Sequence, residues 1–318
     1  MLDTAKVIRE PDLLIAGYTA ACITYVFLGD LTTGLKHADQ VRALYDEEKH
    51  CHLVNLLIND PKTVVCGYAS MSVWMLGYPD RAVSLSDEAV EHARRVGHPF
   101  DLGNALTHGS NVFDYRCEPE ELRKRAVECE SLGQENSLPV LSSFLAPMRL
   151  GVASIREGRF AQGISLLKAS GAARHAIVGK VNLHIRAILA EAMALSGRLD
   201  DALQEIEKCL AQVERPAWGE RLYYAEILRL KGWMLSLKDD PAGAEKSYLA
   251  SLDWAREQQA KSWELRTSTS LARLWQSQGK RKKAHNLLAP VYSWFTEGFD
   301  TKDLKDAKAL LDDLEHAL

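Results

Sequence analysis

The densest group of metal-binding side chains in the sequence is the run His50, Cys51 and His52. Imidazole nitrogen and thiolate sulfur are good zinc ligands, but adjacent residues are hard to bring round one ion. No second pair follows at the spacing of a zinc finger, and the six cysteines include no CxxC pair. We therefore expect no bound metal, and reduced, buried thiols in a cytoplasmic protein.

Histidine and serine side chains could instead act as acid–base or nucleophilic groups. His92, His98 and His108 have Asp101 and Asp114 nearby in the sequence, and a carboxylate often orients a catalytic imidazole. His108, however, falls where a helical repeat needs a large packed side chain. The serines lack a GxSxG context, which argues against a hydrolase. We expect packed histidines, no catalytic residue, no cofactor and no enzyme activity.

The basic run KRKK at 280–283 could contact nucleic acid. It falls at an expected turn, where solvated lysines are usual, and has no aromatic platform beside it for stacking bases. The whole chain has 39 Lys and Arg against 43 Asp and Glu, a net charge of −4, so no overall field attracts it to nucleic acid or anionic lipid. We expect neither nucleic acid nor membrane as a partner.

The stretch 13–28 is apolar but short, and Tyr18, Thr19, Thr24 and Tyr25 interrupt it. It lacks the basic segment and apolar core of a signal peptide, and it is shorter than the ~20 apolar residues of a spanning helix. We interpret it as the first core helix.

The elements that must position these side chains are repeated helical hairpins. Between Leu228 and Phe299 the same pattern occurs twice: a large residue beside a small one, a turn, then small and large residues at helical spacing. Small residues let two helices approach closely, and large ones fill the space between them. The residues are Leu230, Gly232, Trp233, Ala244, Tyr248 and Ser251 in the first copy, and Leu271, Ala272, Trp275, Ala284, Leu288 and Val291 in the second.

Turns recur about every 40 residues, a longer period than the ~34 residues of the shortest tetratricopeptide unit. They are expected near Gly29, Gly77, Arg116, Gly158, Gly197, Asp239 and Gly279. We predict an all-α, tetratricopeptide-like solenoid that forms a single domain over 1–318. Its hairpins are predicted at 12–45, 63–96, 100–133, 137–173, 181–213, 220–257 and 262–296, with a capping helix at 300–318.

Segments such as LGYPDRAVSLSDEAVEHARRVGHPF and AKSWELRTSTSLARLWQSQGK resemble the C-terminal tetratricopeptide region of bacterial cyclase-linked STAND-type ATPases. In that family an adenylate or guanylate cyclase domain, or a helix-turn-helix module, precedes an ATPase and then the helical array. The resemblance implies a sensory or scaffolding arm. The chain departs from the family's full pattern, since it has no GxxxxGK[ST] phosphate loop and no cyclase-like pair of aspartates.

The first helix of each hairpin should line the concave face of the array, where residues one turn apart point the same way. Arg can hold a carboxylate in a bidentate fork and Trp offers flat contact area, which predicts a partner-binding groove. An alternative is ion pairing within the array, such as Glu226 with Arg266. The predicted groove residues are His184, Glu191, Glu226, Arg229, Trp233, Arg266, Thr269 and Arg273. Trp218, Trp254, Trp263 and Trp294 are expected to pack within or between repeats.

Together these observations predict a non-catalytic module that binds a protein or peptide segment, or the ATPase and cyclase domains of its own polypeptide. A small-molecule sensor with its site in the same groove is the alternative. An enzyme with its site in the concavity is a third, less favoured, hypothesis, because a tetratricopeptide scaffold seldom does chemistry alone.

Overall fold

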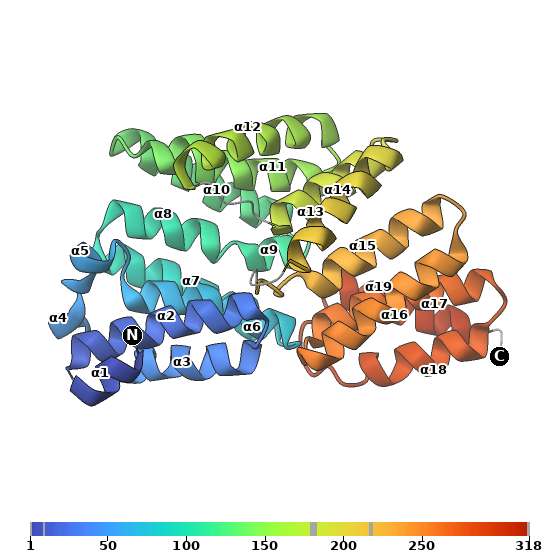
Figure 1. Ribbon diagram of the computed structural model, residues 1–318, viewed down its shortest axis with the longest axis horizontal. Coiled ribbons are helices and arrows are strands. Elements are labelled where there is room, and N and C mark those ends of the chain that lie inside the picture. The colour runs from blue at the N-terminus through green and yellow to red at the C-terminus, as the bar shows by residue number, and fades with distance from the viewer. Residues whose placement is uncertain (1, 9, 179–182, 216–218, 317–318) are drawn as a thin grey trace. The chain divides into compact units, whose positions relative to one another are not determined.

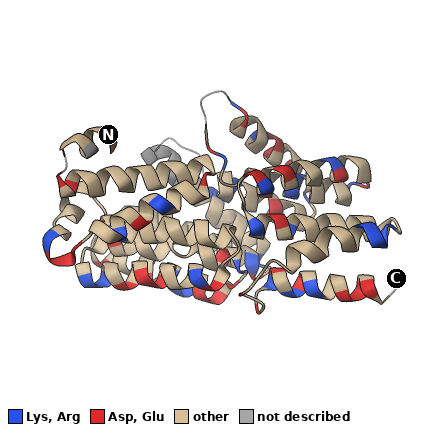
Figure 2. Ribbon diagram, turned by 90° about the horizontal axis from the view of Figure 1, so that it is seen from below, with Lys and Arg blue, Asp and Glu red and all other residues tan. Residues whose placement is uncertain are grey.

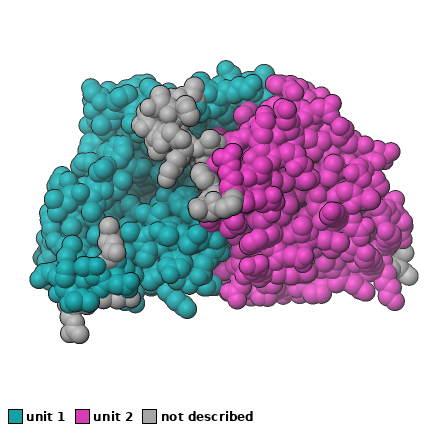
Figure 3. Space-filling view, viewed as in Figure 1, with its two compact units in different colours: residues 1–74, 80–181 teal, residues 75–79, 182–318 magenta. Residues whose placement is uncertain are grey.

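The structure is a computed structural model that describes residues 2–8, 10–178, 183–215 and 219–316. Regular structure within these ranges is helical and contains no strand, which confirms the all-α prediction. The chain divides into two compact units, coloured separately in Figure 3. Unit 1 comprises Met1–Trp74 and Asp80–Val181, and unit 2 comprises Met75–Pro79 and Asn182–Leu318.

Unit 1 contains the first hairpins. Helix α2 packs along α3, α8 packs on α10, and α10 and α12 both pack on α11 (Figure 1). The helices are α1 Leu2–Ile8, α2 Pro11–Leu28, α3 Leu31–Leu44, α4 Glu47–His50, α5 Leu53–Leu57, α6 Pro61–Met75, α7 Pro79–Val96, α8 Pro99–His108, α9 Asn111–Tyr115, α10 Pro119–Glu135, the π-helix η1 Leu141–Leu145, α11 Ala146–Arg156 and α12 Phe160–Val178.

Unit 2 contains three further hairpins, α13–α14, α15–α16 and α17–α18, and the helix α19, which packs on α17 and α18. Four buried leucines and Ala307 of α19 join the core of the last hairpin, as expected of a capping helix. The helices are α13 Leu183–Leu195, α14 Leu199–Val213, α15 Tyr224–Leu237, α16 Pro241–Glu257, α17 Lys261–Ser277, α18 Arg281–Tyr292 and α19 Lys302–Glu315. Residues 181–182 of the predicted fifth hairpin and 317–318 of the predicted cap lie outside the described residues.

The predicted turns are places where the backbone enters the left-handed region, which ends a helix and favours glycine. Positive φ occurs at six of the predicted positions, and the seventh is shifted by one residue from Arg116 to Cys117. The residues and their φ values are Gly29 85°, Gly77 99°, Cys117 58°, Gly158 81°, Gly197 83°, Asp239 59° and Gly279 75°.

Small residues set the close approach of paired helices. A Cβ on Gly34 would lie 2.8 Å from a methyl carbon of Val26, and a Cβ on Gly232 would lie 2.7 Å from the ring of Tyr248. Either contact is shorter than van der Waals packing allows. These glycines therefore permit the helices of their hairpins to touch, as the repeat pattern predicts.

The hairpins of unit 1 are less regular than expected. The segment 46–62, which lies between the predicted first and second hairpins, contains the short helices α4 and α5, and Pro61 begins α6. The first helix of the third hairpin is divided into α8 and α9. That of the fourth begins with the π-helix η1, directly before Pro147, which has no N–H to donate to a helical hydrogen bond.

Helix α2 is the one helix among the described residues that is long and apolar enough to cross a membrane by length and composition. A core helix passes the same test. Ile15, Cys22 and Val26 on α2 are fully buried, and Val26 contacts Gly34 of α3.

Candidate binding groove in unit 2

A groove of about 660 Å³ lies on unit 2 between α13, α15, α16 and α17. We call it the unit 2 groove. Its lining residues are Glu191, Arg229, Trp233, Ser236, Asp239, Pro241, Tyr248, Ser270, Arg273, Leu274, Ser277 and Gln278.

The spacing of the lining residues follows from helix geometry. Arg229, Trp233 and Ser236 are separated by four and three residues on α15. Ser270, Leu274 and Ser277 have the same spacing on α17. Residues three or four apart share one face of a helix, so each helix presents one continuous stripe to the groove.

The cationic groups of the groove differ in what they already bind. Nε and an NH2 nitrogen of Arg229 donate to the two carboxylate oxygens of Glu226, both at 2.7 Å. Burial of the Arg229 guanidinium disfavours its charged form, but the adjacent carboxylate of Glu226 holds the pKa of Arg229 above its usual range. Arg273 is 54% exposed, and its contact with Asp306 is 3.8 Å, longer than a hydrogen bond. Arg273 is therefore the guanidinium most available to an incoming anion.

Hydroxyl groups on α17 supply acceptors. Ser270 donates its hydroxyl hydrogen to the carbonyl of Arg266 at 3.0 Å, and Ser277 donates to the carbonyl of Leu274 at 2.8 Å. Each hydroxyl has one donor and two acceptor lone pairs. Because the donors are used within α17, the oxygens offer lone pairs to N–H groups in the groove.

Half of the residues predicted from the sequence lie in the groove: Glu191, Arg229, Trp233 and Arg273. The other four contribute to packing around it. His184 is 5% exposed and stacks on Tyr223 with the ring centroids 4.3 Å apart. The buried Thr269 donates to the carbonyl of Leu265 at 2.8 Å. That any of these residues binds a partner stays a prediction.

Glu226 and Arg266 belong to an ion-pair chain. The predicted pair of Glu226 and Arg266 is present at 3.9 Å, and Arg266 donates through Nε to Asp303 of α19 at 2.7 Å. The burial of Asp303 raises its pKa even though Arg266 opposes the shift. This chain fixes Glu226, and through it the guanidinium of Arg229, at the edge of the groove.

Sequence reasoning missed Ser236, Tyr248, Ser270, Leu274 and Ser277 as lining residues. The prediction placed the α17 stripe at 266, 269 and 273, about one turn too far toward the N-terminus. A signal was present in the sequence, because Ser270, Leu274 and Ser277 continue the face of Arg273 at helical spacing.

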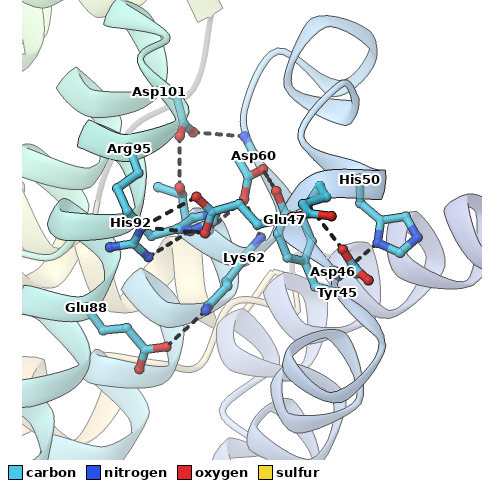
Figure 4. A network of polar contacts seen from close by, with 12 residues as sticks. Tyr45, Asp46, Glu47, His50, Asp60, Lys62, Glu88, His92, Arg95 and Asp101 are labelled. Carbon is cyan, nitrogen blue, oxygen red and sulfur yellow. Dashed lines mark hydrogen bonds and ion pairs between the residues drawn. The ribbon is translucent and has the colours of Figure 1, made fainter.

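The histidines considered for catalysis lie in unit 1, and His92 belongs to an enclosed polar network there (Figure 4). His92 and Asp60 have fully buried side chains, joined by a 2.9 Å contact from His92 Nε2 to Asp60 Oδ1. Asp60 also accepts from the Tyr45 hydroxyl and from the N–H of Thr63. Asp101 accepts from the Asp60 N–H at 2.9 Å, and burial raises its pKa to about 6. A substrate cannot reach these enclosed groups.

The remaining candidates are also engaged in packing. His98 accepts from the N–H of Asp101 at the start of α8, and Asp114 accepts from Arg156 at 2.7 Å. His52 lies 3.0 Å from Asp12, and Cys51 is exposed. Among the described residues, no group of three or more His, Cys, Asp or Glu could hold a metal ion. Of the cysteines predicted to be buried, Cys22, Cys66, Cys129 and Cys209 are, but Cys51 and Cys117 are not.

The basic run at 280–283 and most of the tryptophans that the structure describes also make contacts within the chain. In the KRKK run, Lys283 lies 3.2 Å from Glu245 and Arg281 lies 3.6 Å from Asp313. Basic and acidic residues alternate along the same helices in the view of Figure 2. Trp263 is 1% exposed and the ring of Trp254 lies 4.9 Å from that of Tyr224, tilted by 51°, whereas Trp294 remains 36% exposed. Trp218 lies outside the described residues.

No protein-family model and no curated protein matches this sequence. Solved structures do. NprR in complex with its cognate peptide NprX matches with a TM-score of 0.60 at 14% identity, over 95% of this chain and 83% of that one. The apo form of the quorum sensor NprR from B. thuringiensis matches with a TM-score of 0.54 at 14% identity, over 95% and 80%. A Rap protein complexed with Competence and Sporulation Factor matches with a TM-score of 0.54 at 9% identity, over 95% and 98%.

These identities establish likeness of fold alone. The matched structures are helical repeat proteins, and they confirm the prediction of a tetratricopeptide-like α-solenoid for this chain.

Proposed function

We propose that this protein is a non-catalytic regulatory module that captures an extended peptide segment with an acidic group in the unit 2 groove. The observation that carries the proposal is the combination of Trp233, Tyr248 and the exposed Arg273 in one groove of about 660 Å³. An aromatic surface supplies contact area, and a guanidinium supplies a charge-assisted hydrogen bond to a carboxylate.

The lining groups match the needs of a peptide backbone. Ser270 and Ser277 present acceptors, which suit backbone N–H groups, and the amide of Gln278 presents both donors and an acceptor. The NprR structure similar in fold contains a bound peptide, and so does the Rap conjugation gene regulator of plasmid pLS20, which matches with a TM-score of 0.53 at 9% identity over 95% of this chain and 96% of that one.

A displayed library of random heptapeptides tests the proposal. Peptides enriched on the unsubstituted protein should contain Asp, Glu or a free carboxyl terminus, and should bind Arg273→Gln and Trp233→Ala at least about tenfold more weakly. Arg198→Gln is the matched control, because Arg198 is 45% exposed, pairs with Asp201 and does not line the groove. Enriched peptides that bind all four proteins equally would refute the proposal.

Arg273 is a better test residue than Arg229, although both were predicted to line the groove. Reversal of Arg229 would leave the carboxylate of Glu226 facing a second acid, so lost binding could reflect a distorted groove. Arg273 has no such bidentate partner.

A small-molecule sensor is the second candidate, favoured by the volume of the groove, which lies within the roughly 300–1,000 Å³ of small-molecule sites. A metabolite that raises the melting temperature of the unsubstituted protein but not of Trp233→Ala, and that displaces no enriched peptide, would favour this function.

A partner domain within the same polypeptide is a separate proposal. We propose that, where an ATPase or cyclase domain shares the polypeptide, one of its acidic segments occupies the unit 2 groove. Support comes from the sequence resemblance to the arrays of STAND-type ATPases. Titration of the array with such a domain should show competition with the enriched peptides.

A further inference from the structure

We propose that unit 1 carries a second, uncharged binding site, which takes a leucine-sized side chain from an extended segment of another polypeptide. The site is a cavity of about 110 Å³ between α2, α6 and α8, which we call the unit 1 cavity. Its lining includes no Asp, Glu, Lys or Arg; its one imidazole, that of His108, lies 3.2 Å through Nδ1 from the backbone carbonyl of Asn104. The proposal does not depend on the function of the unit 2 groove.

The size and lining of the cavity select an aliphatic side chain. Ile23, Val64 and Ala105 provide apolar walls. The volume is below the ~150 Å³ of a protein cavity known to hold benzene, so a leucine or isoleucine side chain fits better than a tryptophan. Burying a charged side chain there is costly in free energy, because no Asp, Glu, Lys or Arg lines the cavity to pair with it.

Gly67 keeps the cavity open, although the packing of the helices does not require a glycine. A Cβ at this position would lie 3.8 Å from the Cβ of His108 and 3.9 Å from the backbone nitrogen of Gly109, which are ordinary contact distances. A larger side chain at Gly67, which lines the cavity, would instead occupy the space that we assign to the ligand.

Two asparagines at the cavity present groups that match a peptide bond. Asn104 Nδ2 donates to Asn59 Oδ1 at 2.7 Å and to the carbonyl of Phe100 at 3.2 Å. Neither Asn59 Nδ2 nor Asn104 Oδ1 has a hydrogen-bond partner among the residues that the structure describes. A free donor beside a free acceptor can pair with the C=O and N–H of an extended backbone. An aliphatic small molecule could use only the cavity.

Exposed apolar side chains directly precede Asn59 in the chain. Leu56, Leu57 and Ile58, which directly precede Asn59, are 69%, 39% and 65% exposed. Ile58 has a φ of 70°, which is strained for a β-branched residue. Three consecutive exposed apolar side chains next in the chain to a cavity residue favour a partner that covers both, as a polypeptide segment can.

Methyl NMR of the full chain, labelled at Ile and Val methyl groups and at side-chain amides, tests this inference with short probes. Acetyl-Gly-Leu-Gly-amide should shift the methyl signals of Ile23 and Val64 and the amide signals of Asn59 and Asn104. Acetyl-Gly-Asp-Gly-amide should shift none of them. If the leucine probe leaves these signals in place, or the aspartate probe moves them equally, the proposal fails.

Substitutions separate the cavity from the amide pair. Gly67→Leu should weaken the leucine probe at least about tenfold, whereas Gly171→Leu should not, because nothing lies within 4 Å of a Cβ at that exposed position of α12. Asn104→Leu should weaken the probe about three- to tenfold, and Asn55→Leu, at an exposed position of α5, should leave its affinity unchanged.

A probe that lacks a peptide backbone provides the last test. The alcohol 3-methylbutan-1-ol carries the leucine side chain without a peptide bond. It should bind more weakly than the leucine probe and should be insensitive to Asn104→Leu. If it binds as tightly as the leucine probe, the cavity recognises a small apolar molecule and the assignment of a polypeptide is wrong.

Discussion

Each unit has a site large enough to bind a ligand on the first helices of its hairpins, a cavity in unit 1 and a groove in unit 2. The two sites differ in chemistry. The unit 1 cavity, of about 110 Å³, is lined by no Asp, Glu, Lys or Arg, whereas the unit 2 groove, of about 660 Å³, is lined by two arginines and two carboxylates. Both occur on the same kind of hairpin. The repeat therefore fixes where a ligand can bind, and the side chains of the first helices decide what it is.

The units also differ in where they place polar groups. Unit 1 encloses Asp60, His92 and Asp101 in its core, whereas the guanidinium of Arg273 in unit 2 is 54% exposed in a groove. Enclosed polar groups are costly when they lose a partner, and exposed ones are not. Substitutions at enclosed positions should therefore change stability, and those in the groove should change binding.

Asp60→Ala should have the largest effect of the substitutions considered. It removes the acceptor of the Tyr45 hydroxyl, of His92 and of the N–H of Thr63, all within the core. We expect a loss of about 3–5 kcal/mol in the free energy of unfolding, measured with urea. Asp39→Ala, at a 70% exposed side chain with a 3.8 Å ion pair, should change it by less than about 0.5 kcal/mol. Equal changes in the free energy of unfolding for Asp60→Ala and Asp39→Ala would contradict the predicted difference between core and surface.

The stability of unit 1 should respond to pH through Asp101. Burial raises its pKa from 3.8 to about 6, so the folded protein retains the proton that the unfolded chain releases. Between about pH 4 and pH 6 the folded state binds more protons, and the free energy of unfolding from this group falls as pH rises, by up to about 3 kcal/mol. The stability advantage of the unsubstituted protein over Asp101→Asn should shrink from pH 4.5 to pH 7 in urea titrations. An advantage that grows with pH would contradict this assignment.

Alanine substitutions at two glycines of first helices should change the free energy of unfolding in opposite directions. A Cβ at Gly232 would lie 2.7 Å from the Tyr248 ring, so Gly232→Ala should lower the free energy of unfolding by about 2 kcal/mol. The nearest atom to a Cβ at Gly67 is 3.8 Å away, and Gly67→Ala should raise it by about 0.5 kcal/mol, because alanine is the better helix former. Calorimetric melting of both variants checks the signs. A loss at both positions would show that unit 1 is as tightly packed there as unit 2.

Turn positions were predictable from the sequence because they depend on local chemistry. A left-handed residue ends each first helix, and glycine provides it at Gly29, Gly158 and Gly197. The one displaced position, Cys117 in place of Arg116, has no glycine to mark it. The π-helix η1 and the short helix α4 have no glycine of this kind to mark them, and they were not predictable in this way.

The groove was predictable in composition but only partly in register. Trp233, Arg229 and Arg273 were identified because large and basic side chains stand out at helical spacing. Arg266 was assigned to the groove, yet it donates to Asp303, some 37 positions further along the chain. Which face of a helix is covered depends on such distant partners, and no local pattern reveals them. The unit 1 cavity was missed for the same reason, since Asn59 and Asn104 meet only after folding.

The smallest predicted effect concerns Asp306 of α19, which competes with a ligand for Arg273. The contact between them is 3.8 Å, and Asp306 also pairs with Lys302. Asp306→Asn should change the free energy of unfolding by less than about 0.5 kcal/mol, because exposed ion pairs contribute little. It should raise the affinity of acidic peptides for the unit 2 groove by about two- to fivefold, since the guanidinium no longer faces a carboxylate of its own chain. Asp313→Asn, on the same helix beside Arg281, should leave peptide affinity unchanged. Isothermal titration of the three proteins at low salt distinguishes a local effect at Arg273 from a general change in charge, which would strengthen binding equally in both variants.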